Sequence, residues 1–385
     1  MPEIRRVDPI EVFFDLVFVF AVTQVGDLFI FYSNFKGALT SLLLLAVLWW
    51  LWGAYAWLTN AVVNHDLISR SIILTATAGL LVAGIAVPHA FGASALEFVV
   101  CYIVVRALHV LLYVRANKGV NRDAILRLVP GGVTAALLLL AAIFVPFPLR
   151  VALWAVAVAV DYGTPLVTGV GGFSVAPGHF VERHSLVVLI ALGESITAIG
   201  LGADRIRLTA GFFAAFLAAF AAIAALWWIY FYQEVRPIET AMSRAHGPAL
   251  AHLARDTFSY LHFLLFAGII FISVTIVAVI EHPGAPIHGV DQISLGGGGA
   301  LPLLAFAGMR RRCGGPIRAG FLLGAAGAAG LGLLVAVVPR LAVLGALALI
   351  LLAVAFTGQP DLPVSSDRTR KLHISAIHYS LTRES

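Results

Sequence analysis

The chain has 385 residues, of which 61% are hydrophobic and only 12% are charged, and its mean hydropathy is +0.97. Soluble domains carry about 25% charged residues, so this composition excludes an ordinary soluble protein. The net charge of +5 comes from basic loops between apolar segments. We therefore expect membrane lipids among the partners and no nucleic acid.

Twelve apolar segments of roughly 20 residues predict an all-α, polytopic membrane protein, because a helix of this length crosses a ~30 Å hydrocarbon core. With no water in that core, each span is expected to be a helix. The tenth segment contains four consecutive glycines, each costing about 1 kcal/mol relative to alanine in a helix, which leaves open whether it is a full span. The predicted spans are 11–30, 38–58, 68–88, 94–115, 124–145, 149–168, 180–202, 208–232, 257–280, 293–309, 319–338 and 340–357.

The basic residues predict how these spans are oriented. Nineteen of the 25 Lys and Arg residues fall on the side of the N-terminus, five fall on the opposite side, and Arg106 lies within a span. Cytoplasmic segments carry the excess of basic residues, so we expect an even number of spans with both termini in the cytoplasm. The polar residues 358–385 are expected to form a cytoplasmic tail.

Landmarks recur in the same order in the two halves of the chain. Aromatic pairs occur in the second and eighth spans, an acidic residue precedes the third and ninth, and an arginine ends the fourth and tenth. These landmarks are Trp49-Trp50, Asp66 and Arg115 in the first half, and Trp227-Trp228, Asp256 and Arg310 in the second. The pattern predicts two parallel six-helix repeats, residues 1–178 and 179–357. Transporters built from repeats hold their sites at the repeat interface.

The fourth span carries a polar stripe. Tyr102, Arg106, His109 and Tyr113 lie within a sector of about 60° at 100° per residue, so the stripe is expected to face protein or a water-filled cavity. Arg106 stays charged and needs an anionic partner. From its depth in the seventh span, we expect that partner to be Glu194.

Acidic residues at the starts of spans form a second group of candidates. Glu11 and Asp15 lie four residues apart, so they share one helix face, and Glu182 and Arg183 begin the seventh span. A carboxylate in a first helical turn is also favoured by the helix dipole alone, so interfacial anchoring remains an alternative for Glu11 and Glu182.

Two further polar residues lie inside spans. Asp161 lies deep in the sixth span before Pro165, which frees a backbone carbonyl one turn earlier, so a kink and a binding site both remain open. His262 in the ninth span is a candidate ligand, although packing is the usual role of such a histidine. We expect ionisable residues of both halves, namely Arg106, Glu194, Asp15 and Asp161, to meet in one pocket shielded from lipid.

The sequence contains no motif for a cofactor or a metal. The GxxxxGK[ST] phosphate loop, HExxH, GxSxG and paired-cysteine zinc spacings are all absent. Cys101 and Cys313 lie in a span and in a basic loop, so no disulfide is expected between them. We therefore expect no cofactor and no bound metal.

Two strings, EVFFDLVFVFAVTQ at 11–24 and HFVERHSLVVLIALGESITAIG at 179–200, resemble the bacterial low temperature requirement protein A (LtrA) family. The resemblance implies a polytopic inner-membrane protein, linked by the family name to growth in the cold, and leaves its molecular activity open. Leu186 stands where an acidic counterpart of Asp15 would be expected in the second half. The positions that carry the resemblance are Glu11, Phe14, Asp15, Gln24, His179, Glu182, Arg183, His184, Gly193, Glu194 and Ser195.

Three functions are compatible with the sequence. The first is a secondary transporter for a small solute or an ion, with a buried polar site between the repeats. The second is an intramembrane enzyme acting on a lipid or isoprenoid, with Glu11, Asp15, Glu182 or Asp161 as general acid and base. The third is a structural or stress-related membrane protein without transport. The candidate substrate- or ion-binding residues are Glu11, Asp15, Tyr102, Arg106, His109, Asp161, Glu182, Arg183, Glu194 and His262.

Overall fold

The computed structural model describes residues 7–32, 34–62, 66–116, 119–203, 209–287, 289–333 and 338–357. Within these ranges the regular elements are helices, which confirms the all-α prediction, and a single isolated bridge joins Pro286 and Pro339. The predicted tail, 358–385, lies outside the described residues, as do His65, Lys118, Arg205 and Arg207, on which part of the landmark and charge pattern rests.

The first half of the chain forms six long helices. The first three start at capping side chains that accept a hydrogen bond from the first-turn backbone: Asp8 accepts from Ile10 at 3.1 Å, Asn34 from Gly37 at 3.0 Å, and Asp66 from Ser69 at 3.2 Å. The elements are α1 (Pro9–Phe31), α2 (Phe35–Ala61), α3 (Leu67–Ala86) with the short η1 (Val87–His89), α4 (Ala95–Ala116), α5 (Val120–Ala142) and α6 (Phe147–Val167).

The second half contains two helices that are longer than predicted. The spans expected to end at 232 and to begin at 257 continue to Arg244 and back to Gly247, each passing through a π-helical segment. π-segments are rare and often occur at functional sites. The elements are α7 (Pro177–Ala203), α8 (Ala210–Trp227), η2 (Trp228–Glu234), α9 (Val235–Arg244), α10 (Gly247–Ala254), η3 (Arg255–Leu261), α11 (His262–Glu281), α12 (Val290–Arg312), α13 (Ala319–Gly332) and α14 (Arg340–Thr357).

The glycine-rich tenth segment is a continuous 23-residue helix, α12. Its glycines allow close packing: a Cβ at Gly298 would lie 2.8 Å from the side chain of Ile272 on α11. Tertiary packing therefore offsets the poor helix propensity of these residues.

Ten of the described helices are long and apolar enough to cross a membrane. Each of the twelve predicted spans falls on a helix, but α7 and the 14-residue α13 are not among these ten. The count of twelve therefore stays a prediction.

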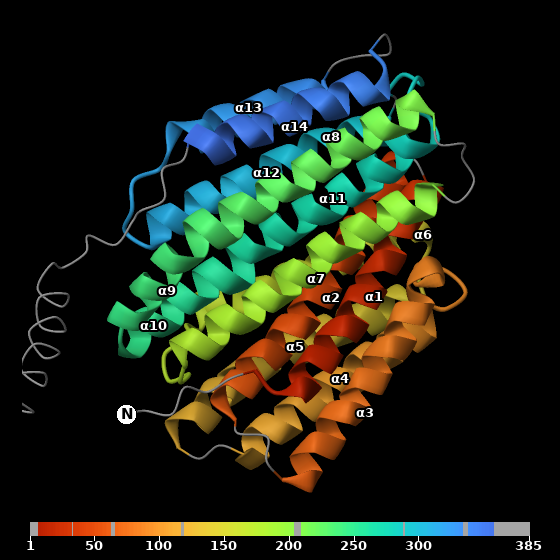
Figure 1. The fold of residues 1–385 in the computed structure, drawn as a ribbon. Helices are drawn as coiled ribbons and strands as arrows, with labels where there is room; N and C mark the ends of the chain where they lie inside the picture. Colours follow the sequence, from red (N-terminus) through yellow and green to blue (C-terminus); the bar gives the residue numbers. More distant parts are fainter. Residues whose placement is uncertain are drawn as a thin grey trace, which may run out of the picture.

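The helices pack in the same order in each half (Figure 1). In the first half α1 packs on α2 and α3, and the chain of neighbours continues α3–α4–α5–α6 and back to α2. In the second half α7 packs on α8 and α11, and the chain continues α11–α12–α13–α14 and back to α8. This is the arrangement that a six-helix repeat predicts, and it supports the repeat without testing its boundaries.

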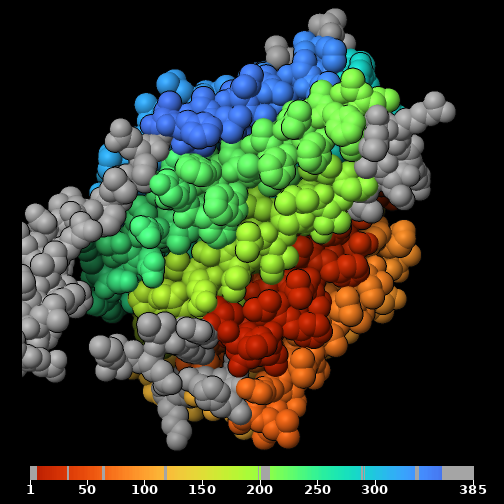
Figure 2. All heavy atoms as spheres, in the orientation of Figure 1, coloured from red at the N-terminus to blue at the C-terminus, as the bar shows by residue number. Residues whose placement is uncertain are grey.

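The two halves meet along α1 and α7. Figure 2 shows α3, α1, α7, α8 and α14 side by side on one face of the molecule, and each adjacent pair in this series is in contact. Helices α2 and α11, behind this face, also join the halves, because α11 contacts both α1 and α2. The most buried helices therefore lie between the two halves, where a site shared by both is expected.

Candidate functional site

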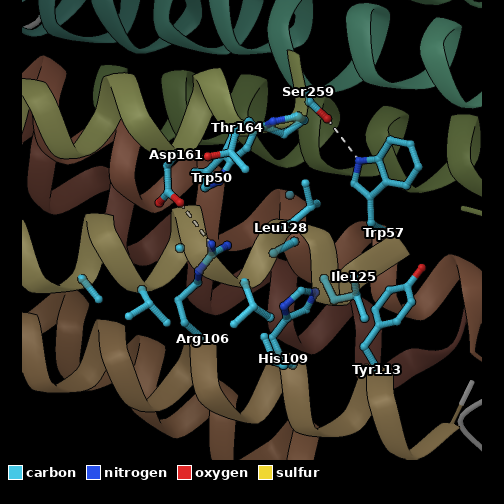
Figure 3. A pocket seen from close by; sticks show the side chains of 18 of the residues that line it. Trp50, Trp57, Arg106, His109, Tyr113, Ile125, Leu128, Asp161, Thr164 and Ser259 are labelled. Carbon is cyan, nitrogen blue, oxygen red and sulfur yellow. Dashed lines mark hydrogen bonds and ion pairs between the residues drawn. The ribbon is translucent and has the colours of Figure 1, made fainter. Parts of the chain in front are cut away.

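A cavity of about 480 Å³ lies among α2, α4, α5, α6 and η3. Its walls are mostly apolar and aromatic, with Trp50, Trp57, Tyr113 and Phe173 among the lining residues. Figure 3 shows Arg106, His109 and Tyr113 of α4 facing Asp161, Thr164 and Ser259 across it. A largely apolar hollow with a few convergent polar groups is the usual form of a small-molecule site.

An ion pair is part of the wall of this cavity. Arg106 Nη2 lies 3.1 Å from Asp161 Oδ1, and the Tyr102 hydroxyl donates to Asp161 Oδ2 at 2.6 Å. The side chains of Arg106 and Asp161 are only 18% and 9% exposed. The three residues come from α4 and α6, so the predicted polar stripe does face protein and a cavity.

The prediction that Glu194 is the partner of Arg106 was wrong. Asp161 takes that place because α6 packs on α5 and α2, and both of these helices also pack on α4. Glu194 instead lies on α7, next to Thr23 and Asp27 of α1. Depth in the membrane alone does not determine the partner of a buried charge; the lateral order of the helices also decides it.

His109 is a buried side chain without a hydrogen-bond partner. It is 4% exposed and lines the cavity, and neither ring nitrogen makes a hydrogen bond to the described residues; the backbone of Ala54 is near but not in hydrogen-bonding geometry. Its contacts are the rings of Tyr55 and Tyr113, at centroid distances of 5.6 and 5.9 Å. Buried polar atoms are rarely left unpaired, so the imidazole is available to a ligand or to water in the cavity.

The second half of the chain contributes one wall through η3. Arg255 Nη1 donates to the Pro165 carbonyl at 3.0 Å, and Trp57 Nε1 donates to Ser259 Oγ at 3.1 Å. Trp49 Nε1 donates to the Ser259 carbonyl at 2.9 Å. The cavity therefore lies mainly in the first half and is completed by a π-segment of the second.

The cavity opens on the side of the bundle. Among its lining residues, Leu111 of α4 is 55% exposed and Val133 of α5 is 50% exposed, and Ala107 of α4 is also exposed. These residues place the mouth between α4 and α5, at the apolar surface that faces lipid in a membrane protein.

A separate polar cluster joins α1 to α7. Arg183 Nη2 lies 3.1 Å from Asp15 Oδ1, and His179 Nε2 lies 2.9 Å from Glu11 Oε2. All four side chains are at most 1% exposed. Both pairs join residues that are 168 positions apart, and a constant offset means that α1 and α7 run parallel at the same depth.

Residues of α2 complete this cluster. Trp52 Nε1 donates to Asp15 Oδ1 at 2.7 Å, and Arg183 donates to the Thr59 hydroxyl. Asn60 Oδ1 accepts a hydrogen bond from the backbone N–H of Ala176 at 2.8 Å. Asn60 Nδ2 therefore donates to His179 Nδ1, 3.1 Å away, which makes Nδ1 the acceptor. This network assigns the proton of His179 to Nε2, which donates to Glu11.

The cluster has two carboxylates and one guanidinium, all of them buried. Asp15 Oδ2 and Arg183 Nε have no hydrogen-bond partner among the described residues. None of the four charged or histidine side chains lines the cavity. The cluster is therefore a contact between the halves, with one carboxylate more than its arginine neutralises.

Two predicted site residues lie elsewhere. Glu182 is exposed at the start of α7 and belongs to neither group. His262 is fully buried, and both ring nitrogens have partners: Tyr230 OH at 3.0 Å and the Thr257 carbonyl at 2.8 Å. These contacts agree with a packing role for His262.

The expectation of one shared pocket was therefore wrong in part. Arg106 and Asp161 share the cavity, but Asp15 lies in the α1–α7 cluster and Glu194 lies further along the same interface. The sequence analysis did not identify Ser259 or Arg255 as lining residues. The only signal for both was the polar sequence RDTFSY before an apolar span.

Taken together, the apolar helices and the buried ion pairs around an internal cavity define a multi-pass helical membrane protein. The profile of the family "Bacterial low temperature requirement A protein (LtrA)" matches residues 6–356, and the chain belongs to this family. A relative is an uncharacterized protein, RA0937, from Rhizobium meliloti (strain 1021). It is 28% identical over 285 residues, which cover 71% of this chain and 69% of the relative.

Proposed function

We propose that the protein is a carrier in the inner membrane, with both termini in the cytoplasm, and that the cavity beside Arg106 and Asp161 is its substrate site. The observation that carries the proposal is the unpartnered His109 in a cavity with a buried ion pair. Ionisable groups within a span are costly and mark substrate or ion pathways. A protein with only a structural role would be expected to fill this volume with side chains.

The α1–α7 cluster is a contact that a movement of one half against the other would have to change. Its charged groups are almost inaccessible to solvent, and it lies where the two predicted repeats meet. Carriers of this type work by one repeat moving against the other around the site. We propose that Glu11, Asp15, His179 and Arg183 hold the halves in the arrangement described here.

The enzyme alternative has less support. It requires carboxylates that reach a substrate, yet Glu11 and Asp15 lie outside the cavity and Glu182 is exposed. Asp161 does line the cavity, but both of its oxygens already accept hydrogen bonds, from Arg106 and from Tyr102. General acid–base catalysis needs a group within reach of the substrate proton.

Proteoliposomes test the carrier directly. Proteoliposomes that contain the protein are adsorbed on a solid-supported membrane, and charge movement is recorded when octanoate, benzoate, tryptophan or tyramine is added. We expect currents for at least one of them, and a change of at least about tenfold in apparent affinity in Asp161→Asn, which corresponds to about 1.4 kcal/mol of binding free energy.

Asp291→Asn is the matched control. Asp291 also pairs with an arginine, Arg340, but this pair lies outside the cavity. The control variant is expected to retain the currents. Absence of current with all four solutes, or equal currents in Asp161→Asn and the wild type, would count against a carrier with this site.

A further inference from the structure

We infer that the ligand of the cavity is a single-chain lipid anion that enters from the bilayer between α4 and α5. The inference rests on the proposed function, because it names the substrate class of the same site. Three features carry it: the charge of the lining, the arrangement of its polar groups and the position of the mouth.

The lining carries more positive than negative charge. The charged residues of the lining are Arg106, Arg255 and Asp161. Arg255 also pairs with Asp256 at 2.7 Å, and this carboxylate, which is outside the lining, is shared with Arg312. In this group three guanidinium groups therefore face two carboxylates. Arg106 is held at Asp161, and Arg255 is held at the carbonyl of Pro165, four residues later on α6. Four residues of α-helix rise by about 6 Å, slightly more than one turn, so the two guanidinium groups approach successive turns on the same face of α6.

An anionic head group is therefore the complementary ligand. Guanidinium groups bind carboxylate and phosphate oxygens through charge-assisted hydrogen bonds. The unpartnered His109 supplies a further polar contact from α4, where it lies three residues after Arg106. A cation would instead meet two arginines across a largely apolar space.

The remainder of the lining suits one apolar chain. Trp50, Trp57, Phe173 and Leu128 form an apolar and aromatic wall. The volume of about 480 Å³ lies in the ~300–1,000 Å³ range of pockets that hold one small ligand, which favours a single chain over a two-chain phospholipid.

The mouth explains how such a molecule arrives. Ala107 and Leu111 of α4 and Val133 of α5 are apolar, exposed and part of the lining. An apolar passage at the lipid-facing surface admits a molecule that is already dissolved in the bilayer. A water-soluble ion would have to leave water to reach the same opening.

Quenching of tryptophan fluorescence tests the assignment, because Trp50 and Trp57 line the cavity. The full chain is placed in phospholipid nanodiscs and titrated with 9,10-dibromostearate or with the uncharged 9,10-dibromostearyl alcohol. We expect a saturable quenching component for the acid, which unbrominated oleate displaces. It is expected to be weaker in a Trp50→Phe/Trp57→Phe variant, in which Trp49 is the remaining tryptophan of the lining. The alcohol is expected to bind at least about tenfold more weakly, the loss of one charge-assisted hydrogen bond.

Two pairs of variants separate the head-group site from the mouth. Arg255→Gln removes a guanidinium of the lining and leaves Asp256 paired with Arg312. Its control is Arg312→Gln, which removes the other arginine partner of Asp256, because Arg312 does not line the cavity. Only Arg255→Gln is expected to weaken dibromostearate binding.

A second pair of variants tests the mouth. Ala107→Phe is expected to slow or abolish quenching. Val104→Phe, which is exposed on the same helix but outside the lining, is expected to leave quenching unchanged.

The outcomes distinguish this inference from the carrier itself. Equal affinity for acid and alcohol in the wild-type protein overturns the anionic ligand, as does equal binding by Arg255→Gln and Arg312→Gln. Currents with tryptophan or tyramine in the absence of dibromostearate binding overturn the ligand class and leave the carrier intact. Saturable dibromostearate binding without any transport current supports the inference on the ligand and contradicts the proposed carrier function.

Discussion

At the scale of single residues, the cavity depends on Arg106 having both a partner and space. Asp161 supplies the opposite charge, and α5 supplies the space through Gly132, where a Cβ would lie 2.6 Å from Arg106 Nη2. The guanidinium group thus occupies room that a larger residue on α5 would remove. A glycine at this point of α5 is needed for the close approach of the arginine.

The first prediction concerns that space. Gly132→Ala is expected to displace the Arg106 guanidinium and to weaken binding of an anionic ligand, here dibromostearate, by about tenfold, because the loss of one charge-assisted hydrogen bond is of this order. Gly163→Ala on α6 is the control, since a Cβ there meets nothing within 4 Å. Unchanged binding in Gly132→Ala would show that the position of Arg106 is not set by α5.

The second prediction concerns the charge of Arg106. Arg106→Gln leaves Asp161 buried without a counter-charge, which is expected to cost about 3–5 kcal/mol of unfolding free energy. The double variant Arg106→Gln/Asp161→Asn removes both charges and is expected to recover most of that loss. Denaturant unfolding in detergent measures both; equal losses in the single and double variants would contradict the pairing.

At the scale of helices, the sequence predicted the polar face of α1 but did not predict that this face contacts α7. Glu11 and Asp15 share a helix face, as their spacing of four indicates, and both face α7. Spacing along one helix says nothing about which neighbour it meets, so the pairing with residues 168 positions later was not predictable. The loop between α6 and α7 connects this contact to the cavity, because Asn60 binds Ala176 and Phe173 packs on Trp57.

The third prediction tests this contact. Arg183→Gln removes the one guanidinium of the cluster, which lies 3.1 Å from Asp15 and 3.8 Å from Glu11. We expect it to lower the free energy of unfolding by about 3–5 kcal/mol. Glu182→Gln, at the exposed neighbouring position, is expected to change it by less than about 0.5 kcal/mol. Thermal unfolding of the two purified variants measures the difference, and similar midpoints would refute a stabilising role for the cluster.

At the scale of the whole molecule, the sequence predicted the fold class and the positions of the helices better than it predicted their contacts. Hydropathy places helices because each span must satisfy its own backbone in lipid. The partners of Arg106 and Glu194 depend instead on which helices lie side by side, and one sequence does not contain that order. Residues Ser259 and Arg255 reach the cavity only because η3 packs against α2 and α6.

The fourth prediction concerns orientation. In a protein without Cys101 and Cys313, we expect a cysteine at Ala93, between α3 and α4, to react with an impermeant maleimide added to intact cells. A cysteine at Ser174, between α6 and α7, is expected to react only after permeabilisation. Both positions are exposed. The reverse pattern would invert the topology that the basic residues predict.

A high-resolution density map of the protein purified from native membranes tests the central claim most directly. We expect elongated non-protein density in the cavity, with one end within hydrogen-bonding distance of Arg106, His109 or Arg255 and the other directed to the gap between α4 and α5. A map in which α5 closes on α4, side chains fill the volume and no such density remains would contradict it.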